Sequence, residues 1–288
     1  MTLTQLHKKA KKEGWAVPHF NFSTFTLLYA ILDGATHQRA PVLAGTSEGE
    51  RDFLGIKQCV NMVKSLREKY DVPIFLNADH TKSVERAKEA VDAGYDSIHI
   101  DLSRESYQKN LEGVKRIVDY AKSKNKNIEV EGELGYLATE SSKVYKEKIT
   151  IPEDSYTKVE QAVEFVEKTK VDRLAPAIGN LHGIAANKPV IRFDLIEKLT
   201  KSLPPTTTLV LHGGSGIADK DLKKIVTSGF NNIHISTELR FAYTQGLKDA
   251  LSTNKDDIAP YNYMNSAMEK VQKIVIEKLQ LYNTVNVV

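Results

Sequence analysis

The sequence has very little cysteine and no long apolar run. Cys59 is the only cysteine among 288 residues, so no disulfide can form within the chain, and we expect a reducing, cytoplasmic location. No stretch approaches the roughly 18 consecutive apolar residues that cross a membrane. The first residues, MTLTQLHKKAKKEGW, also lack the apolar run of a signal peptide. We therefore predict neither export by a signal peptide nor a membrane partner.

The chain also has no large excess of charge of one sign. The chain carries 40 Lys and Arg against 37 Asp and Glu, a formal net charge of +3, and its basic residues are scattered. A nucleic-acid-binding protein usually concentrates them on one face or stretch, so we expect no nucleic-acid partner. With 41% hydrophobic and 27% charged residues, the composition is that of a globular protein with a large core.

The pattern along the chain alternates short β-branched runs with longer helical periodicity. Eight candidate strands occur at 16–20, 42–46, 73–77, 97–101, 128–132, 173–177, 208–212 and 232–236. Helical patterns lie between and after them, for example at 26–39, 56–70, 84–93, 108–124, 159–168, 219–228, 238–251 and 265–281. Strand and helix alternating eight times predict an α/β fold, a (β/α)8 TIM barrel, for which roughly 250 residues is typical.

No linker or low-complexity tract divides the chain, so we expect one domain over residues 1–288 with a C-terminal helical extension, its helices at about 256–282. One segment does not fit the alternation. Residues 136–156 are polar and show no clear periodicity. We expect a flexible loop there, either a lid over a site or a surface excursion.

Reactive side chains gather at the predicted strand ends. They are Asn21, Ser47, Asn77, Asp79, His80, Asp101, Glu133, His182, His212, Ser236 and Thr237. In a (β/α)8 barrel these ends meet on the face that carries the active site. His80, His182 and His212 would then be neighbours, and three histidines around an open position are typical of catalytic zinc.

The carboxylates and glycines at the same face suggest further roles. Asp79 would point into the same mouth as a general acid or base, while Asp101 and Glu133 could serve a second or alternative metal position. The glycine-rich turn HGGSG at 212–216 and the hydroxyls of Ser236 and Thr237 favour a phosphate site, which such barrels often form after strands seven and eight. We interpret the other histidines as structural or surface residues, with His7 and His37 solvated.

These residues resemble, in order and over nearly the whole chain, the class II zinc-dependent ketose-bisphosphate aldolases, including fructose- and tagatose-bisphosphate aldolases. The matching stretches are FN (20–21), SEG (47–49), ADH (78–80), SIHIDLS (97–103), VEGELG (130–135), LAPAIGNLHG (174–183), LHGGSG (211–216) and STELR (236–240). The resemblance implies that Asp79 is the proton donor and acceptor. It implies His80, His182 and His212 as zinc ligands, with Asp101 and Glu133 as further metal positions.

The same resemblance implies the substrate contacts and the assembly. The implied substrate-binding positions are Asn21, Ser47, Gly183, Gly213, Gly214, Ser215, His234, Ser236 and Thr237. In some members Na⁺ or K⁺ also binds main-chain carbonyls near the ligand histidines. Relatives are homodimers or homotetramers.

The implied reaction is reversible cleavage of a phosphorylated ketose to dihydroxyacetone phosphate and an aldehyde. A Schiff-base aldolase would need a lysine at a strand end, and none of the predicted strands ends in one. Two rivals remain open. One is a degenerate barrel that binds zinc and a sugar phosphate with little turnover, and the other is a zinc hydrolase, for which the phosphate loop would be superfluous.

The sequence departs from the family pattern near the site. Asn77 and Thr81 replace His and Gly around the DH pair, Leu102 replaces Gly, Asn180 replaces Thr or Ser, and His234 replaces a substrate-contacting Asn. The C-terminal segment at 256–267 has no Lys or Arg, although the family uses a basic residue there for the distal phosphate. We therefore expect altered specificity, for a ketose with one phosphate or with another distal anion.

Overall fold

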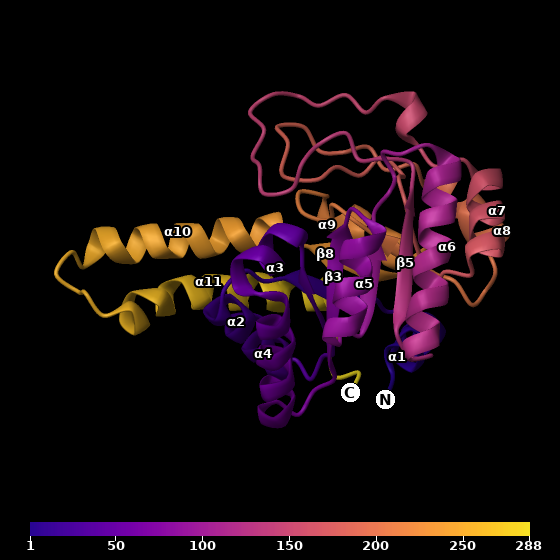
Figure 1. Ribbon diagram of the computed structural model, residues 1–288. Coiled ribbons are helices and arrows are strands. Elements are labelled where there is room, and N and C mark those ends of the chain that lie inside the picture. The colour runs from indigo at the N-terminus through magenta and orange to yellow at the C-terminus, as the bar shows by residue number, and fades with distance from the viewer.

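A computed structural model describes residues 1–288, and its centre is a closed barrel of parallel strands in the order β1 to β8 (Figure 1). The strands are β1 (Val17–Asn21), β2 (Val42–Thr46), β3 (Ile74–Thr81), β4 (Ser97–Ile100), β5 (Glu129–Leu134), β6 (Arg173–Pro176), β7 (Thr208–Leu211) and β8 (Phe230–Ile235). Each pairs with its sequence neighbours, and β8 pairs with β1. The predicted (β/α)8 barrel is confirmed.

Helices surround the barrel. They are α1 (Leu3–Glu13), α2 (Phe25–His37), α3 (Glu48–Leu54), α4 (Ile56–Lys69), α5 (Val84–Ala93), α6 (Tyr107–Lys124), the 3₁₀ turn η1 (Glu153–Ser155), α7 (Val159–Thr169), α8 (Phe193–Ser202), α9 (Asp219–Thr227), α10 (Thr237–Thr253) and α11 (Pro260–Leu281). The helix predicted at 84–93 has the same bounds, and α11 begins five residues before its prediction at 265, where Pro260 suits the first turn.

Apolar packing explains why the alternating strands and helices form a closed barrel. Strands buried on both faces read as continuous apolar runs, and every residue of β1 and β2 is buried. One cluster of 60 buried apolar residues joins the barrel to its helices. A smaller cluster of six, including Leu6 and Trp15, packs α1 against the strands.

The predicted solvation of His7 is wrong, because this α1 residue is 2% exposed and its Nδ1 lies 3.0 Å from Oε2 of Glu129.

An irregularity in β3 shapes the mouth of the barrel. The pairing of β3 with β4 shifts register between Ala78 and Thr81, and His80 adopts a positive φ of 43°. Consecutive strand residues normally face opposite sides, whereas a bulge re-aims a side chain and strengthens the local bend. Asp79 and His80 consequently both line the cavity at the mouth.

The excursion after β5, which is the predicted loop at 136–156, lies over the mouth of the barrel (Figure 1). An isolated bridge joins Val144 to Ile184 in the segment after β6. Thr139 donates a hydrogen bond to the carbonyl of His182 at 2.7 Å, and the main-chain N of Ser142 donates to Thr237 Oγ1 at 3.2 Å. The excursion therefore touches the ends of β6 and β8.

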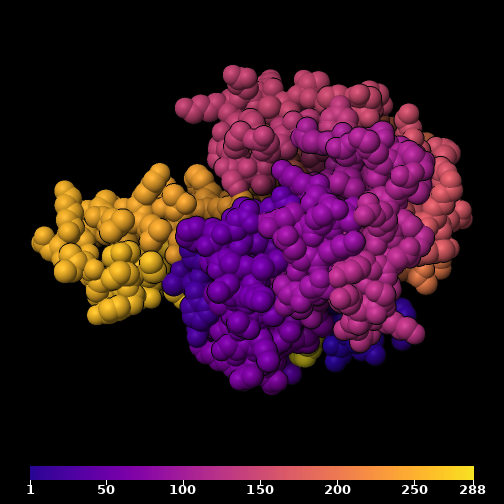
Figure 2. Space-filling model, viewed as in Figure 1, coloured from indigo at the N-terminus to yellow at the C-terminus, as the bar shows by residue number.

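The C-terminal helices α10 and α11 form an antiparallel arm that stands clear of the barrel at its far end (Figure 2). The second half of α11 returns to the barrel and packs Val275 and Leu279 into the main core. The far end leaves apolar side chains exposed, among them Ile258 at 89% and Tyr261 at 76%. No helix combines the length and apolar character that a membrane crossing needs.

Candidate active site

The strand ends surround a cavity of about 400 Å³ lined by 21 residues, none of them hydrophobic. All the site residues predicted from sequence line it except Asn77, Glu133 and Gly214. Those lining it are Asn21, Ser47, Asp79, His80, Asp101, His182, Gly183, His212, Gly213, Ser215, His234, Ser236 and Thr237. Glu133 is 3% exposed, and its Oε2 lies 3.3 Å from His99 Nε2. Strands far apart in sequence thus contribute to one polar mouth.

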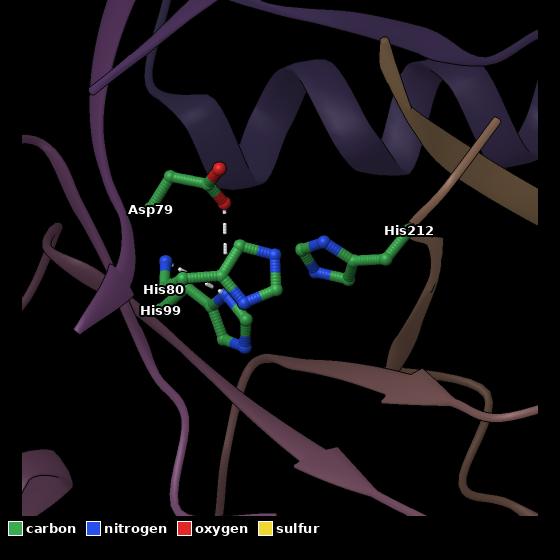
Figure 3. A group of neighbouring side chains, drawn as sticks. All are labelled: Asp79, His80, His99 and His212. Atoms are coloured by element: carbon green, nitrogen blue, oxygen red, sulfur yellow. Dashed lines mark hydrogen bonds and ion pairs between the residues drawn. The ribbon is translucent and has the colours of Figure 1, made fainter. Parts of the chain in front are cut away.

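The three histidines predicted as ligands lie together. The ring centroid of His80 is 4.7 Å from that of His182 and 4.6 Å from that of His212, while His182 and His212 are 6.1 Å apart. His99, which we had interpreted as structural, also belongs to this group. Potential ligand atoms of Asp79, His80, His99 and His212 all lie within 4.8 Å of one another (Figure 3).

Asp79 is held by several polar neighbours. Its Oδ2 accepts a hydrogen bond from Asn21 at 3.0 Å, and its Oδ1 lies 3.4 Å from His234 Nδ1 and 3.6 Å from His99 Nδ1. Burial acts to raise the pKa of Asp79, but His80 and the contacts with His234 and His99 outweigh it and hold that pKa well below its usual value. The carboxylate is therefore ionised, which is the form that a general base needs.

Two histidines of the cluster have raised pKa values. Burial acts to lower the pKa of His80, but Asp79 and the hydrogen bond to Asp101 at 2.9 Å raise it overall. Burial likewise opposes protonation of His99, and Glu131, Asp79 and Glu133 raise its pKa well above the ordinary value. The carboxylates around the mouth thus attract positive charge to the place where the histidine rings meet.

The remaining histidines of the mouth are neutral. Burial, followed by the charge of nearby histidines, lowers the pKa of His182, His212 and His234 to about 3 in each case. A neutral imidazole keeps one nitrogen lone pair, which is the form that binds a metal.

Glu131, which the sequence reasoning missed, orients one of these rings. Its Oε1 lies 2.6 Å from His212 Nε2, and its Oε2 lies 3.0 Å from Arg173 Nη1. With Nε2 donating to Glu131, the Nδ1 atom of His212 is left as the ligand atom. A sequence signal was present, because Glu129, Glu131 and Glu133 alternate along β5 and such alternation aims all three toward one side.

The donor set fits a divalent metal such as zinc. His80 has Nε2 free when Nδ1 bonds to Asp101, and imidazole nitrogens with carboxylates are the ligands zinc prefers. The buried Glu133 Oε2 has no hydrogen-bond partner, as expected of an oxygen that can bind a cation. Asp101, Glu133 and His80 form a second compact group of potential ligands.

The ends of β1 and β2 are organised by Glu50, another residue that sequence reasoning did not select. This carboxylate is 6% exposed and accepts from Asn21 Nδ2 at 3.2 Å and from the main-chain N of Ser47 at 2.7 Å. It also pairs with Arg240 at 2.5 Å. Glu50 therefore fixes two of the predicted substrate contacts at once.

The glycine-rich turn after β7 meets the first turn of α10. Gly213 has a φ of 63° and lies so close to the carbonyl of Leu181 that a side chain would not fit. Ser215 Oγ accepts from the N of Glu238 at 3.3 Å. Ser236 precedes α10 without capping it, and its buried Oγ has no partner. Free amides at a helix N-terminus with a spare hydroxyl form a place for an anion.

Most departures from the family pattern have structural roles beside the cavity. Asn77 bonds to Ser97 at 2.7 Å within the barrel, and Thr81 accepts from Arg51 at 3.0 Å. Leu102 packs against α6 at Gly113. Asn180 donates to the carbonyl of His212 at 2.8 Å and thereby supports the strand end that carries that ring.

His234 is the one departure that faces Asp79. Its ring stacks on His19 with centroids 3.5 Å apart and planes 7° from parallel. A side chain at Gly45 would overlap the ring of His19, so the glycine makes room for the stack. The stack places His234 Nδ1 3.4 Å from Asp79 Oδ1, and neither atom has a hydrogen-bond partner.

Comparison with known proteins agrees with this geometry. A protein-family model described as "Fructose-bisphosphate aldolase class-II" matches residues 1–287. The fructose-bisphosphate aldolase of Staphylococcus aureus is 34% identical over 282 residues, covering 96% of this chain and 95% of that one. The crystal structure of the YdjI aldolase from Escherichia coli K12 has a TM-score of 0.83 at 29% identity, covering 99% and 97% of the two chains. The fructose-bisphosphate aldolase of Campylobacter jejuni, with a TM-score of 0.83 at 22% identity over 99% and 95%, shares the fold.

Proposed function

Because the chain belongs to the class II fructose-bisphosphate aldolase family, a zinc-dependent family of carbon–carbon lyases, we propose that it reversibly cleaves a phosphorylated ketose to dihydroxyacetone phosphate and an aldehyde. Fructose 1,6-bisphosphate, tagatose 1,6-bisphosphate and related sugar phosphates are the candidate substrates. The observation that carries this proposal is the placement of ionised Asp79 beside the cluster of His80, His99 and His212, in one cavity with the anion-binding turn.

The phosphate of the dihydroxyacetone half binds at the ends of β7 and β8. Gly213 and Ser215 line the cavity at this turn, while the main-chain N of Gly214 donates to the carbonyl of His234 at 3.2 Å and fixes the turn against β8. Ser236 and Thr237 stand at the start of α10. The helix N-terminus favours the negative charge. Gly183 has a φ of 78° and lies against the excursion carbonyl of Lys143, which keeps this side of the cavity narrow.

Asp79 acts as the general base and acid. Its low pKa leaves it ionised, so it accepts the proton of the ketose hydroxyl whose oxygen becomes the aldehyde, and it returns the proton in the synthetic direction. Asn21, itself fixed by Glu50, holds Oδ2 at 3.0 Å. His234 faces Oδ1 and restricts the carboxylate to one orientation.

His80, His182 and His212 would hold zinc, with Asp101 and Glu133 as an alternative position. When bound, zinc supplies Lewis-acid stabilisation of the ketose oxygens and of the negative charge that develops as the carbon–carbon bond breaks. Glu131 keeps the His212 ring in the tautomer that leaves Nδ1 available. We extend this proposal to Na⁺ or K⁺ at main-chain carbonyls near these histidines.

The direct test is product formation with and without a chelator. Zinc-loaded protein should release dihydroxyacetone phosphate from a ketose phosphate, measured by coupling to glycerol-3-phosphate dehydrogenase, and chelation should abolish the release. Chelator-insensitive cleavage would overturn the metal assignment. Zinc and sugar-phosphate binding without release would instead support the degenerate binding protein.

We also propose that the chain forms a homodimer or homotetramer through the arm of α10 and α11. The arm exposes Phe241 at 55%, Leu251 at 50% and Ile258 at 89%, and exposed apolar patches of this kind commonly mark contacts between proteins. Light scattering coupled to size exclusion would report the subunit number. An Ile258→Asp, Phe241→Asp variant should shift the assembly to monomer, and an unchanged mass would refute this interface.

A further inference from the structure

We infer that Glu238 and Lys278 are positioning residues for the glycine-rich turn at 212–216. The carboxylate of Glu238 holds the turn in the shape that binds phosphate, and Lys278 neutralises this carboxylate so that it does not repel the phosphate. The inference rests on the phosphate site of the proposed aldolase function. Neither residue lines the cavity, so both act through the turn and not by touching the substrate.

The turn divides its main-chain amides between the fold and the cavity. The N of Gly214 donates to a carbonyl of β8 at 3.2 Å, and the N of Gly216 donates to Glu238 Oε1 at 2.8 Å. The amides of Gly213 and Ser215 donate to no other group of the protein, and both residues line the cavity. Two engaged amides thus fix the turn, while the other two are available to an anion.

Glu238 binds this turn through its main chain as well as its side chain. Its own N donates to Ser215 Oγ at 3.3 Å, while its Oε1 accepts from Gly216. Gly216 has a φ of 83°, a conformation in which glycine leaves the backbone free to move unless a partner fixes it. Loss of the carboxylate contact would therefore release the end of the turn and displace the neighbouring amide of Ser215.

The carboxylate of Glu238 stands where a second anion is unwelcome. Glu238 is the second residue of α10, next to Thr237 and the preceding Ser236, so it shares the helix N-terminus with the proposed phosphate site. Two anions at one helix end repel each other and compete for its positive potential. Without neutralisation, Glu238 would weaken phosphate binding although its hydrogen bond shapes the site.

Lys278 of α11 removes this conflict. Its Nζ lies 2.8 Å from Glu238 Oε2, the oxygen that the turn does not use, and the two side chains are 7% and 18% exposed. Lys278 is the only charged residue among those that α11 buries, and a lysine is seldom buried without a partner. Because α10 and α11 run antiparallel, the end of α11 lies beside the start of α10 (Figure 1). The ion pair therefore connects the arm to the phosphate site.

The experiment first removes the neutralising cation. In Lys278→Met, the affinity of the zinc-loaded protein for dihydroxyacetone phosphate and for inorganic phosphate, measured by calorimetric titration, should fall about 3- to 30-fold, the range for a charge at a partly buried helix end. KM for the ketose phosphate should rise by a similar factor while kcat stays within about twofold of wild type, as for lost binding that is uniform along the reaction.

Two double variants without a buried unpaired charge separate neutralisation from packing and keep the test valid if Lys278→Met is unstable. Lys278→Met with Glu238→Gln should regain phosphate affinity to within about threefold of wild type, because the amide oxygen still accepts from Gly216 and no charge remains. Lys278→Met with Glu238→Ala should stay about 3- to 10-fold weaker than wild type, since the hydrogen bond to the turn is lost.

Lys270→Met is the matched control, because Lys270 forms the other ion pair between the same two helices, with Asp249, and does not line the cavity. It should leave phosphate affinity and KM unchanged. Three results would each overturn the inference: wild-type affinity in Lys278→Met, a loss that Glu238→Gln does not restore, or equal affinities in the two double variants.

Turnover separates this inference from the aldolase proposal. If the variants bind dihydroxyacetone phosphate in the expected order but the wild type cleaves no ketose phosphate, the positioning role stands and the aldolase proposal fails. If the wild type cleaves and all variants bind phosphate equally, the aldolase proposal stands and the positioning role fails. If the wild type neither cleaves nor binds phosphate, both are refuted.

Discussion

Replacing Glu131 by glutamine should weaken zinc binding while preserving the fold. Glu131 is fully buried, with Oε1 2.6 Å from His212 Nε2 and Oε2 3.0 Å from Arg173 Nη1. The amide keeps the shape of the carboxylate but loses its charge and half of its acceptor capacity. His212 then loses the partner that fixes its tautomer and makes its Nδ1 more basic.

The expected magnitude follows from the position of Glu131 one contact away from the proposed metal. Removing such a partner typically lowers metal affinity about 10- to 100-fold, which corresponds to roughly 1.4–2.7 kcal/mol. The apo protein should also lose about 1–3 kcal/mol of its free energy of unfolding, since Arg173 and His99 keep their charge with one fewer acidic neighbour.

Competition with a chromophoric chelator measures the zinc affinity, and urea unfolding of the apo protein measures the stability. Glu129→Gln is the matched control. Glu129 is 2% exposed and its Oε2 lies 3.4 Å from Nε of the same Arg173, but its histidine neighbour is His7 of α1 and not a histidine of the cavity. This control should lose stability and keep its zinc affinity. The reasoning fails if Glu131→Gln binds zinc within threefold of wild type, or if Glu129→Gln weakens zinc equally.

Other expectations concern the stack, the phosphate site and the pH dependence. Gly45→Ala should lower the free energy of unfolding by about 1–3 kcal/mol in a urea titration, because the new methyl group overlaps the His19 ring; an unchanged midpoint would refute this. Ser236→Ala should raise KM for the ketose phosphate several-fold in steady-state assays, since the unpartnered Oγ beside α10 is lost, whereas an unaltered KM would remove Ser236 from the phosphate site. Zinc affinity should fall as the pH falls through the pKa of His80, because zinc needs the deprotonated ring. Burial acts to lower this pKa, but Asp79 and Asp101 raise it overall. Calorimetry in buffers of different ionisation enthalpy should detect proton release near neutral pH, and buffer-independent heats would contradict the assignment.

Much of the fold was predictable because its signals are local. Short buried parallel strands and amphipathic helices each leave their own periodicity, and the strand ends of a (β/α)8 barrel converge by geometry. That rule is sufficient to place His80, His182 and His212 together without any contact information. The same rule brought Asn21, Ser47 and Ser236 into one cavity.

The remaining features depend on contacts that no local pattern encodes. The bulge that turns both Asp79 and His80 into the mouth comes from the register of β3 against β4. His99 joins the cluster only because β4 and β5 align it with Glu131 and Glu133. His7 is buried because α1 closes the end of the barrel, whereas its sequence surroundings are rich in lysine.

The central claim is that Asp79 moves the proton while zinc is held by other residues. Asp79→Ala, loaded with zinc, should release dihydroxyacetone phosphate about 10²- to 10⁴-fold more slowly than wild type, the usual contribution of a general base, with one zinc per active site retained by elemental analysis. A variant that cleaves at the wild-type rate with zinc bound would contradict the account, as would a variant that fails only because it no longer folds or binds zinc.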